Sequence, residues 1–231
     1  MFLKRWRVVF FLALVVLPQI AFPQADSLAT KRLSLLISPQ HLLLRGYHLD
    51  LEKHLRSSKR HSLLFSARVY AGSTRFADFF TTRKEEAQDF SYVKGAGAEV
   101  QHRIYFRKFN QQTYSAKYIA YGFSFHRFNI DFEKEGWIQE RAEDGLLYYQ
   151  FKYHTFTEQI NRWGALVLYG TQEGFFSGRV LLDSNIGLGY NYSSTTSDYH
   201  APRFNRNLFD YGNSGLYLYL GLKLGVVLLT K

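Results

Sequence analysis

The sequence predicts an all-β protein: an eight-stranded antiparallel transmembrane β-barrel of the up-and-down meander type, preceded by a cleaved signal peptide. Three observations lead to this prediction. An export signal stands at the N-terminus, apolar residues recur at every second position along the rest of the chain, and the longest alternating segments exceed the five or six residues of an average strand. The chain of 231 residues has no cysteine, which excludes disulfides, thiolate metal sites and catalytic thiols.

Residues 1–25 have the order of parts of a secretory signal peptide. A basic start is followed by an apolar run from Val8 to Val16 and then by small residues. An uncleaved transmembrane helix is the alternative, but the apolar stretch is shorter than the roughly 20 residues needed to cross hydrocarbon, and a proline interrupts it. We expect cleavage after Ala25, with Ala21 as the alternative, and one barrel domain over residues 26–231.

The C-terminal segment shows the clearest alternation. A helix cannot separate the two sets of residues, whereas successive side chains of a strand point to opposite faces. The segment is also long enough for a tilted strand that crosses a bilayer, which needs roughly 9–11 residues. The apolar set is Leu216, Leu218, Leu220, Leu222, Leu224, Val226 and Leu228, and the opposite set is Tyr217, Tyr219, Gly221, Lys223 and Gly225.

The remaining strands follow from the same pattern and from the need to return both termini to one side of the membrane. We expect strands over 32–43, 46–55, 61–72, 98–106, 119–131, 146–171 and 178–192 before the C-terminal one. The first is the weakest because Pro39 interrupts it. The sixth is expected to bulge near 155–161 and to project above the membrane with its upper half. Short turns fall at 56–60, 107–114 and 171–177, and long loops at 73–91, 132–145 and 193–214. Long loops lie outside the cell in such barrels.

Several short segments, in this order, resemble small outer-membrane β-barrel proteins of Bacteroidota-type bacteria. The resemblance covers most of the mature chain and implies outer-membrane location and a barrel fold, because the family mostly lacks an assigned activity. The chain departs from such barrels at its end, which is Leu229-Thr230-Lys231 instead of an aromatic residue. The segments are Pro39, Gly46, Asp50-Leu51-Glu52-Lys53, Ile160-Asn161-Arg162-Trp163-Gly164, Ile186-Gly187-Leu188-Gly189-Tyr190 and Gly221-Leu222-Lys223-Leu224-Gly225.

Alternation places an equal number of acidic and basic residues inside the barrel. Because a charge in a low-dielectric interior is costly unless it is paired, we expect these residues to form a salt-bridged plug; a small selective pore is the alternative. The residues are Asp50, Glu52, Glu99 and Asp183, with Arg68, Arg103, Arg162 and Lys223.

No common catalytic, cofactor or metal motif is found, so we expect a non-enzymatic protein without a cofactor. The alternative is a lipopolysaccharide-modifying enzyme, for which Ser124, His126 and Glu133 are the one set of candidates. His126 and His154 are expected to form hydrogen bonds inside the barrel.

The long loops are the expected places of recognition. Aromatic residues there could contact a partner protein of the envelope or a surface glycan, and loop arginines could pair with lipopolysaccharide phosphates. Nucleic acid is not an expected partner of an exported barrel. The loop candidates are Phe76, Phe79, Phe80, Trp137, Arg203 and Arg206, and the expected aromatic girdles at the membrane interfaces include Tyr190, Tyr192, Tyr217 and Tyr219.

Overall fold

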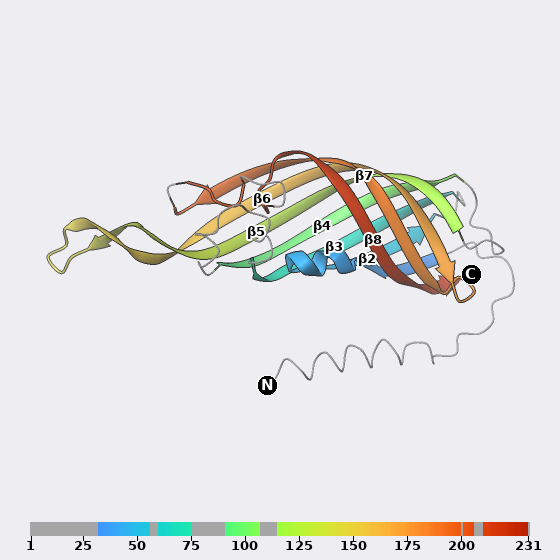
Figure 1. The fold of residues 1–231 in the computed structure, drawn as a ribbon, viewed down its shortest axis with the longest axis horizontal. Helices are drawn as coiled ribbons and strands as arrows, with labels where there is room; N and C mark the ends of the chain where they lie inside the picture. The colour runs from blue at the N-terminus through green and yellow to red at the C-terminus, as the bar shows by residue number, and fades with distance from the viewer. Residues whose placement is uncertain are drawn as a thin grey trace, which may run out of the picture.

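The protein forms one closed barrel in which each strand pairs with its neighbours in the sequence and the last pairs with the first (Figure 1). The computed structural model describes residues 32–55, 60–74, 91–106, 115–199, 201–205 and 210–230. The expected signal peptide and the loop residues Phe76, Phe79, Phe80 and Arg206 lie outside these ranges.

All neighbouring strands are antiparallel, which confirms the predicted all-β meander. Among the described residues no helix is long and apolar enough to span a membrane. The strands are β1 (Arg32–Ile37), β2 (Gly46–His54), β3 (His61–Ser73), β4 (Ser91–Tyr105), β5 (Ser115–Arg141), β6 (Leu147–Phe175), β7 (Val180–Ser197) and β8 (Gly215–Thr230).

The first strand is shorter than predicted. It ends at Ile37, and a 3₁₀ helix, η2 (Pro39–Leu44), replaces the rest of the expected strand over 32–43. Pro39 has no N–H for a strand ladder, whereas it is well suited to the first turn of a helix. Arg45 then adopts a left-handed conformation, with φ of 56°, and leads into β2.

The fifth and sixth strands are longer than predicted and form a hairpin that extends well beyond the rest of the barrel (Figure 1). The expected loop at 132–145 is wrong, because the register continues without a shift from Ser115↔Glu173 to Arg141↔Leu147. The same unbroken register shows that the bulge expected at 155–161 is absent. We call the barrel end from which this hairpin projects the ribbon end, and the opposite end the turn end.

Burial alternates along the strands as the sequence pattern predicts. The outward side chains of β8, from Leu216 to Leu228, are 38–75% exposed, whereas inward residues such as Lys223 are buried. Tyr190 and Tyr192 face outward as expected. Tyr217 and Tyr219 do not: both are shielded and pack against the interior cluster around Tyr118, so their expected place in an outer girdle is wrong.

Candidate functional site

A layer of buried charges crosses the barrel near its turn end. Arg103 of β4 lies 2.5 Å from Asp183 of β7 and 3.3 Å from Glu52 of β2, and none of the three side chains is exposed. The Arg103 guanidinium also lies over the ring of Tyr118, 4.5 Å from its centre. These contacts join strands on different sides of the barrel, so the layer occupies the lumen itself.

Neutral donors surround the two carboxylates of this layer. Glu52 accepts hydrogen bonds from Ser62 and Tyr105, both at 2.6 Å, and from Gln172 at 2.9 Å. The carboxylate–donor network compensates for removing the charges from water, as buried ions require.

Asp183 is surrounded in the same way. It accepts hydrogen bonds from Tyr118 at 2.7 Å and from Asn185 at 2.9 Å. Alternation in the sequence predicts that Asp183 lies inside the barrel. It does not predict which neutral side chains will donate hydrogen bonds to Asp183.

Two further ion pairs stand inside the barrel. Lys223 of β8 lies 2.7 Å from Asp50 of β2, and Arg68 of β3 lies 2.5 Å from Glu99 of β4. Seven of the eight charged residues expected in the interior therefore lie in ion pairs.

Arg162 differs from the other interior charges. Within the described part of the chain no carboxylate lies within ion-pair distance of it. Its guanidinium donates to the Tyr211 carbonyl at 3.1 Å and lies over the Phe128 ring, 5.1 Å from its centre. The equal numbers of acids and bases do not produce four one-to-one pairs, because Arg103 takes two carboxylates.

An aromatic cluster fills the ribbon end of the interior. It joins strand residues of β3 to β6 to the connection between β7 and β8, which folds into the barrel mouth and contributes Phe204 and Tyr211. Arg203 belongs to this connection; its backbone N–H and that of Phe204 donate to the buried Glu158 carboxylate, at 2.8 and 3.2 Å. The Arg203 guanidinium lies over the Phe132 ring, 4.9 Å from its centre.

The residues proposed for an enzymatic alternative do not form a catalytic set. Ser124 and His126 are both buried on β5, and His126 is bonded to Arg68 instead of Ser124. Glu133 lies on the same strand seven residues beyond His126, a separation of about 23 Å for an extended chain. His154, expected inside the barrel, is exposed on the projecting hairpin and packs on Phe156.

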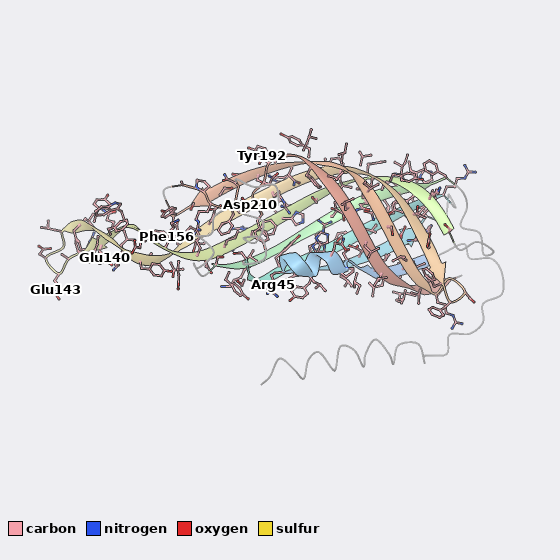
Figure 2. The ribbon with its side chains drawn as sticks, viewed as in Figure 1. Arg45, Glu140, Glu143, Phe156, Tyr192 and Asp210 are labelled. Carbon is pink, nitrogen blue, oxygen red and sulfur yellow. The ribbon has the colours of Figure 1, made fainter. Side chains whose placement is uncertain are left out.

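The projecting hairpin carries a dense group of exposed aromatic and aliphatic side chains. We call its two-stranded part, residues 133–157, the ribbon. Figure 2 shows Phe156 where the ribbon leaves the barrel, with Glu140 and Glu143 far beyond it. The exposed apolar residues of the ribbon are Trp137, Leu146, Leu147, Tyr148, Tyr149, Phe151 and Tyr153.

Cross-strand contacts organise the ribbon surface. Trp137 is 67% exposed and packs edge-to-face on Phe151, its direct partner across the hairpin, with ring centres 5.4 Å apart. Lys152 forms an ion pair with Glu140, and Tyr148 donates to the same carboxylate at 3.1 Å. Hydrogen bonds from Lys152 and Tyr148 hold the pKa of Glu140 below its ordinary value.

Of the exposed apolar residues of the ribbon, only Trp137 is among the sequence-based candidates. A signal for the others is present in the aromatic-rich stretch from Leu146 to Tyr153. The sequence-based prediction places that stretch in the upper half of the strand over 146–171, which is expected to project above the membrane, and it names no binding role for it.

No group of histidine, cysteine, aspartate or glutamate side chains suited to hold a metal ion is found in the described ranges.

Comparison with known proteins gives structural similarity only. No protein-family model matches the chain, and no curated protein matches it. The crystal structure of a major outer membrane protein from Thermus thermophilus is similar, with a TM-score of 0.47 and 10% identity over 86% of this chain and 99% of that one.

Two structures from Acinetobacter baumannii are also similar. CarO gives a TM-score of 0.37 at 8% identity, covering 88% of this chain and 99% of that one. CarO2 gives 0.40 at 9% identity, covering 85% and 96%.

Proposed function

We propose that the protein is a non-enzymatic, non-conducting outer-membrane β-barrel whose function is to hold the ribbon outside the cell, where the ribbon binds a partner protein of the envelope. The band of exposed apolar side chains around a closed barrel carries the first part of this proposal. Soluble monomers rarely expose a contiguous apolar patch of more than a few hundred Å². A bilayer is the environment in which such a band is stable.

The band extends across several strands. Its members include Phe65 on β3, Phe123 on β5, Val167 on β6 and Leu188 on β7, each more than half exposed, together with the outward leucines of β8. The inward residues on the same strands include the charged and polar side chains of Arg68, Ser124, His126, Asp183 and Lys223, together with buried aliphatic side chains such as Leu64 and Leu168. This division between faces is the pattern of strands that contact lipid on one side only.

The buried charge layer supports the non-conducting part of the proposal. Arg103, Glu52 and Asp183 close the lumen near the turn end and expose no surface to water. The aromatic cluster with Phe204 and Tyr211 fills the ribbon end. Ion passage would require both layers to open.

The ribbon has the composition of a binding surface. Tryptophan and tyrosine are enriched among the residues that contribute most to protein–protein affinity, and the ribbon presents both beside the ion pair of Lys152 with Glu140. Trp137, Tyr149 and Phe151 are each more than half exposed, so these side chains are available to a partner.

The membrane part is tested by fractionation. We expect the mature protein in the outer-membrane fraction and a shift in gel mobility between unheated and boiled samples, because closed barrels resist detergent unfolding. Recovery in the soluble periplasm without a mobility shift would contradict the barrel anchor.

The binding part is tested by site-specific photo-crosslinking from position Tyr149 in intact cells. A discrete protein adduct is expected, and Trp137→Ala should reduce it several-fold. Trp163→Ala is the matched control, since Trp163 is 58% exposed and also packs on a phenylalanine, but lies in the apolar band of the barrel. An adduct to glycan alone, or equal loss in both variants, would contradict a protein partner of the ribbon.

A further inference from the structure

Four strands place basic side chains in one row of the strand register on the inner wall of the barrel. The register pairs His48 of β2 with Arg68 of β3, Arg68 with Gly97 of β4, Gly97 with His126 of β5, and His126 with Arg162 of β6. Neighbouring strands lie about 4.8 Å apart, and directly opposite residues share a face. We call His48, Arg68, His126 and Arg162 the basic row.

The basic row has one carboxylate for two permanent cations. Glu99 pairs with Arg68 at 2.5 Å, and Arg162 contacts a backbone carbonyl and an aromatic ring. Near the turn end the balance is reversed, since two carboxylates share Arg103. Asp50, Glu52, Glu99 and Asp183 are each paired with another cation, and Glu158 accepts from two backbone N–H groups. Arg162 therefore has no ion-pair partner among the described residues, and a cation without a counter-charge is costly in a shielded position.

The protonation of His126 follows from its partner. Arg68 Nη1 lies 3.1 Å from His126 Nε2, and a guanidinium can only donate. Nε2 must therefore accept, and the ring proton must sit on Nδ1. That Nδ1–H is buried and has no acceptor among the described residues. The ring itself is almost fully shielded, with 2% of its residue surface exposed.

Arg162 presents a second donor of the same kind. Its Nε–H is buried and has no acceptor in the described part of the chain, and Arg162 is the direct cross-strand partner of His126. Two N–H groups on residues paired directly across neighbouring strands thus lack acceptors in the described part of the chain, and one of them belongs to a cation without an ion-pair partner there. A buried donor without an acceptor costs about 1–3 kcal/mol, so a pair of them in one place calls for a ligand.

We propose that the basic row binds a small monoanionic carboxylate, held by Arg162 Nε–H and His126 Nδ1–H. A monoanion matches the single excess charge, whereas a dianion would leave a buried negative charge. A carboxylate supplies two acceptor oxygens in one plane, which suits a guanidinium edge and a second donor. Because Tyr211 accepts from Arg162, the connection between β7 and β8 covers this site from the ribbon end.

The test uses the full mature barrel, refolded in detergent in a chloride-free buffer, with sodium acetate as the probe. Titration calorimetry should detect acetate binding to the wild type, and acetate should raise the thermal unfolding midpoint. Sulfate at equal ionic strength should give neither effect. Arg162→Gln should abolish binding, and His126→Phe should weaken it about tenfold or more, since phenylalanine has no N–H donor while Arg68 keeps its ion pair with Glu99.

Arg127→Gln is the matched control, because Arg127 is the neighbour of His126 on the outward face and is exposed; it should bind acetate like the wild type. Without acetate, Arg162→Gln should be at least as stable as the wild type, since it removes an uncompensated cation. Absence of acetate binding by the folded wild type would overturn the proposal. The proposal would also be overturned if Arg162→Gln were less stable than the wild type by the same amount with and without acetate. That result would show that Arg162 only stabilises the fold, through its contact with Tyr211.

Discussion

At the scale of single residues, Gly97 shows how the inner wall accommodates a large side chain. A Cβ at this position would collide with the His126 ring and would lie 2.7 Å from the Phe125 carbonyl oxygen. The His126 ring therefore lies over a strand position that must have no side chain. These contacts give Gly97 a packing role on the inner wall.

Gly97→Ala should destabilise the barrel by about 1–3 kcal/mol, the usual cost of forcing extra volume into a packed interior. Urea unfolding in detergent measures the change. Ala96→Val is the control, since Ala96 faces outward and is exposed, and it should change stability by less than about 0.5 kcal/mol. Equal stability of the two variants would show that His126 moves away from Gly97 without cost.

Arg103 is the interior charge whose removal should cost most. Arg103→Gln leaves Glu52 and Asp183 buried without their cation, and breaking such an ion pair costs about 3–5 kcal/mol. The control is Lys94→Gln, which breaks the exposed pair with Asp131, and exposed pairs contribute about 0–1 kcal/mol. Chemical denaturation of both variants measures the difference, and similar losses would contradict the burial argument.

Glu158 makes the stability of the barrel mouth depend on pH. Burial raises the pKa of Glu158 above its ordinary value, even though the backbone N–H groups of Arg203 and Phe204 oppose the shift. A raised folded-state pKa means that protonation favours the folded form. This contribution is fully present below the ordinary pKa of glutamate and is lost as pH rises through the folded-state pKa.

Hydrogen exchange at Arg203 and Phe204, corrected for intrinsic rates, should therefore show better protection in mildly acidic buffer than at neutral pH. Glu158→Gln, which stays neutral, should remove this pH dependence. A wild type with equal protection at both pH values would show that the pKa of Glu158 is not raised.

At the scale of elements, the ribbon should be the least stable part of the described structure. β7 ends at Ser197, opposite Glu158, and β4 begins at Ser91, opposite Phe132. Beyond these points β5 and β6 pair only with each other among the described strands, and an isolated two-stranded hairpin is marginally stable in water. Local opening concentrates in such segments.

Amides of the ribbon should exchange at least tenfold faster than amides at the centres of β5 and β6, such as Phe123 and Val167, because local opening costs less free energy there. Trp137→Ala should increase ribbon exchange further because it removes the packing on Phe151, and it should leave Phe123 and Val167 unchanged. Hydrogen–deuterium exchange measured by mass spectrometry provides both comparisons. Uniform protection along β5 would contradict a separately opening ribbon.

The errors of the sequence-based elements have two different physical causes. Alternation reports which face a side chain takes, and it predicts the strands well where one face is apolar and the other polar. It fails at 32–43, where Pro39 decides the backbone. It also fails at 132–145, where beyond Gly136 the side chains on both faces of the ribbon are at least partly exposed and the pattern disappears. A polar or mixed strand outside the band is indistinguishable from a loop by periodicity.

The same limit applies to the interior site. Alternation places all eight charged residues inside, and each of them is directed there, but it does not report their height along the barrel. Which charged residues form ion pairs depends on which positions of the strands come close together, and the strand register sets this. The sequence therefore could not show that Arg103 would take two carboxylates or that Arg162 would lie beside His126 without one.

At the scale of the whole molecule, the two filled layers predict a barrel that does not conduct ions. Arg103, Glu52 and Asp183 lie across the lumen near the turn end, and an eight-stranded barrel is only wide enough to be filled by side chains. The aromatic cluster with Phe204 forms a second barrier. The mature wild type in a planar lipid bilayer should give no steady current above the background of protein-free membranes.

The triple variant Glu52→Ala, Arg103→Ala and Asp183→Ala removes the charge layer without leaving an unpaired buried charge. If the aromatic cluster is a second barrier, this variant should remain non-conducting while its unfolding midpoint falls. Adding Phe204→Ala and Tyr211→Ala should then permit small, discrete current steps. Conductance in the wild type would contradict the closed lumen, and conductance in the triple variant alone would assign the whole barrier to the charge layer.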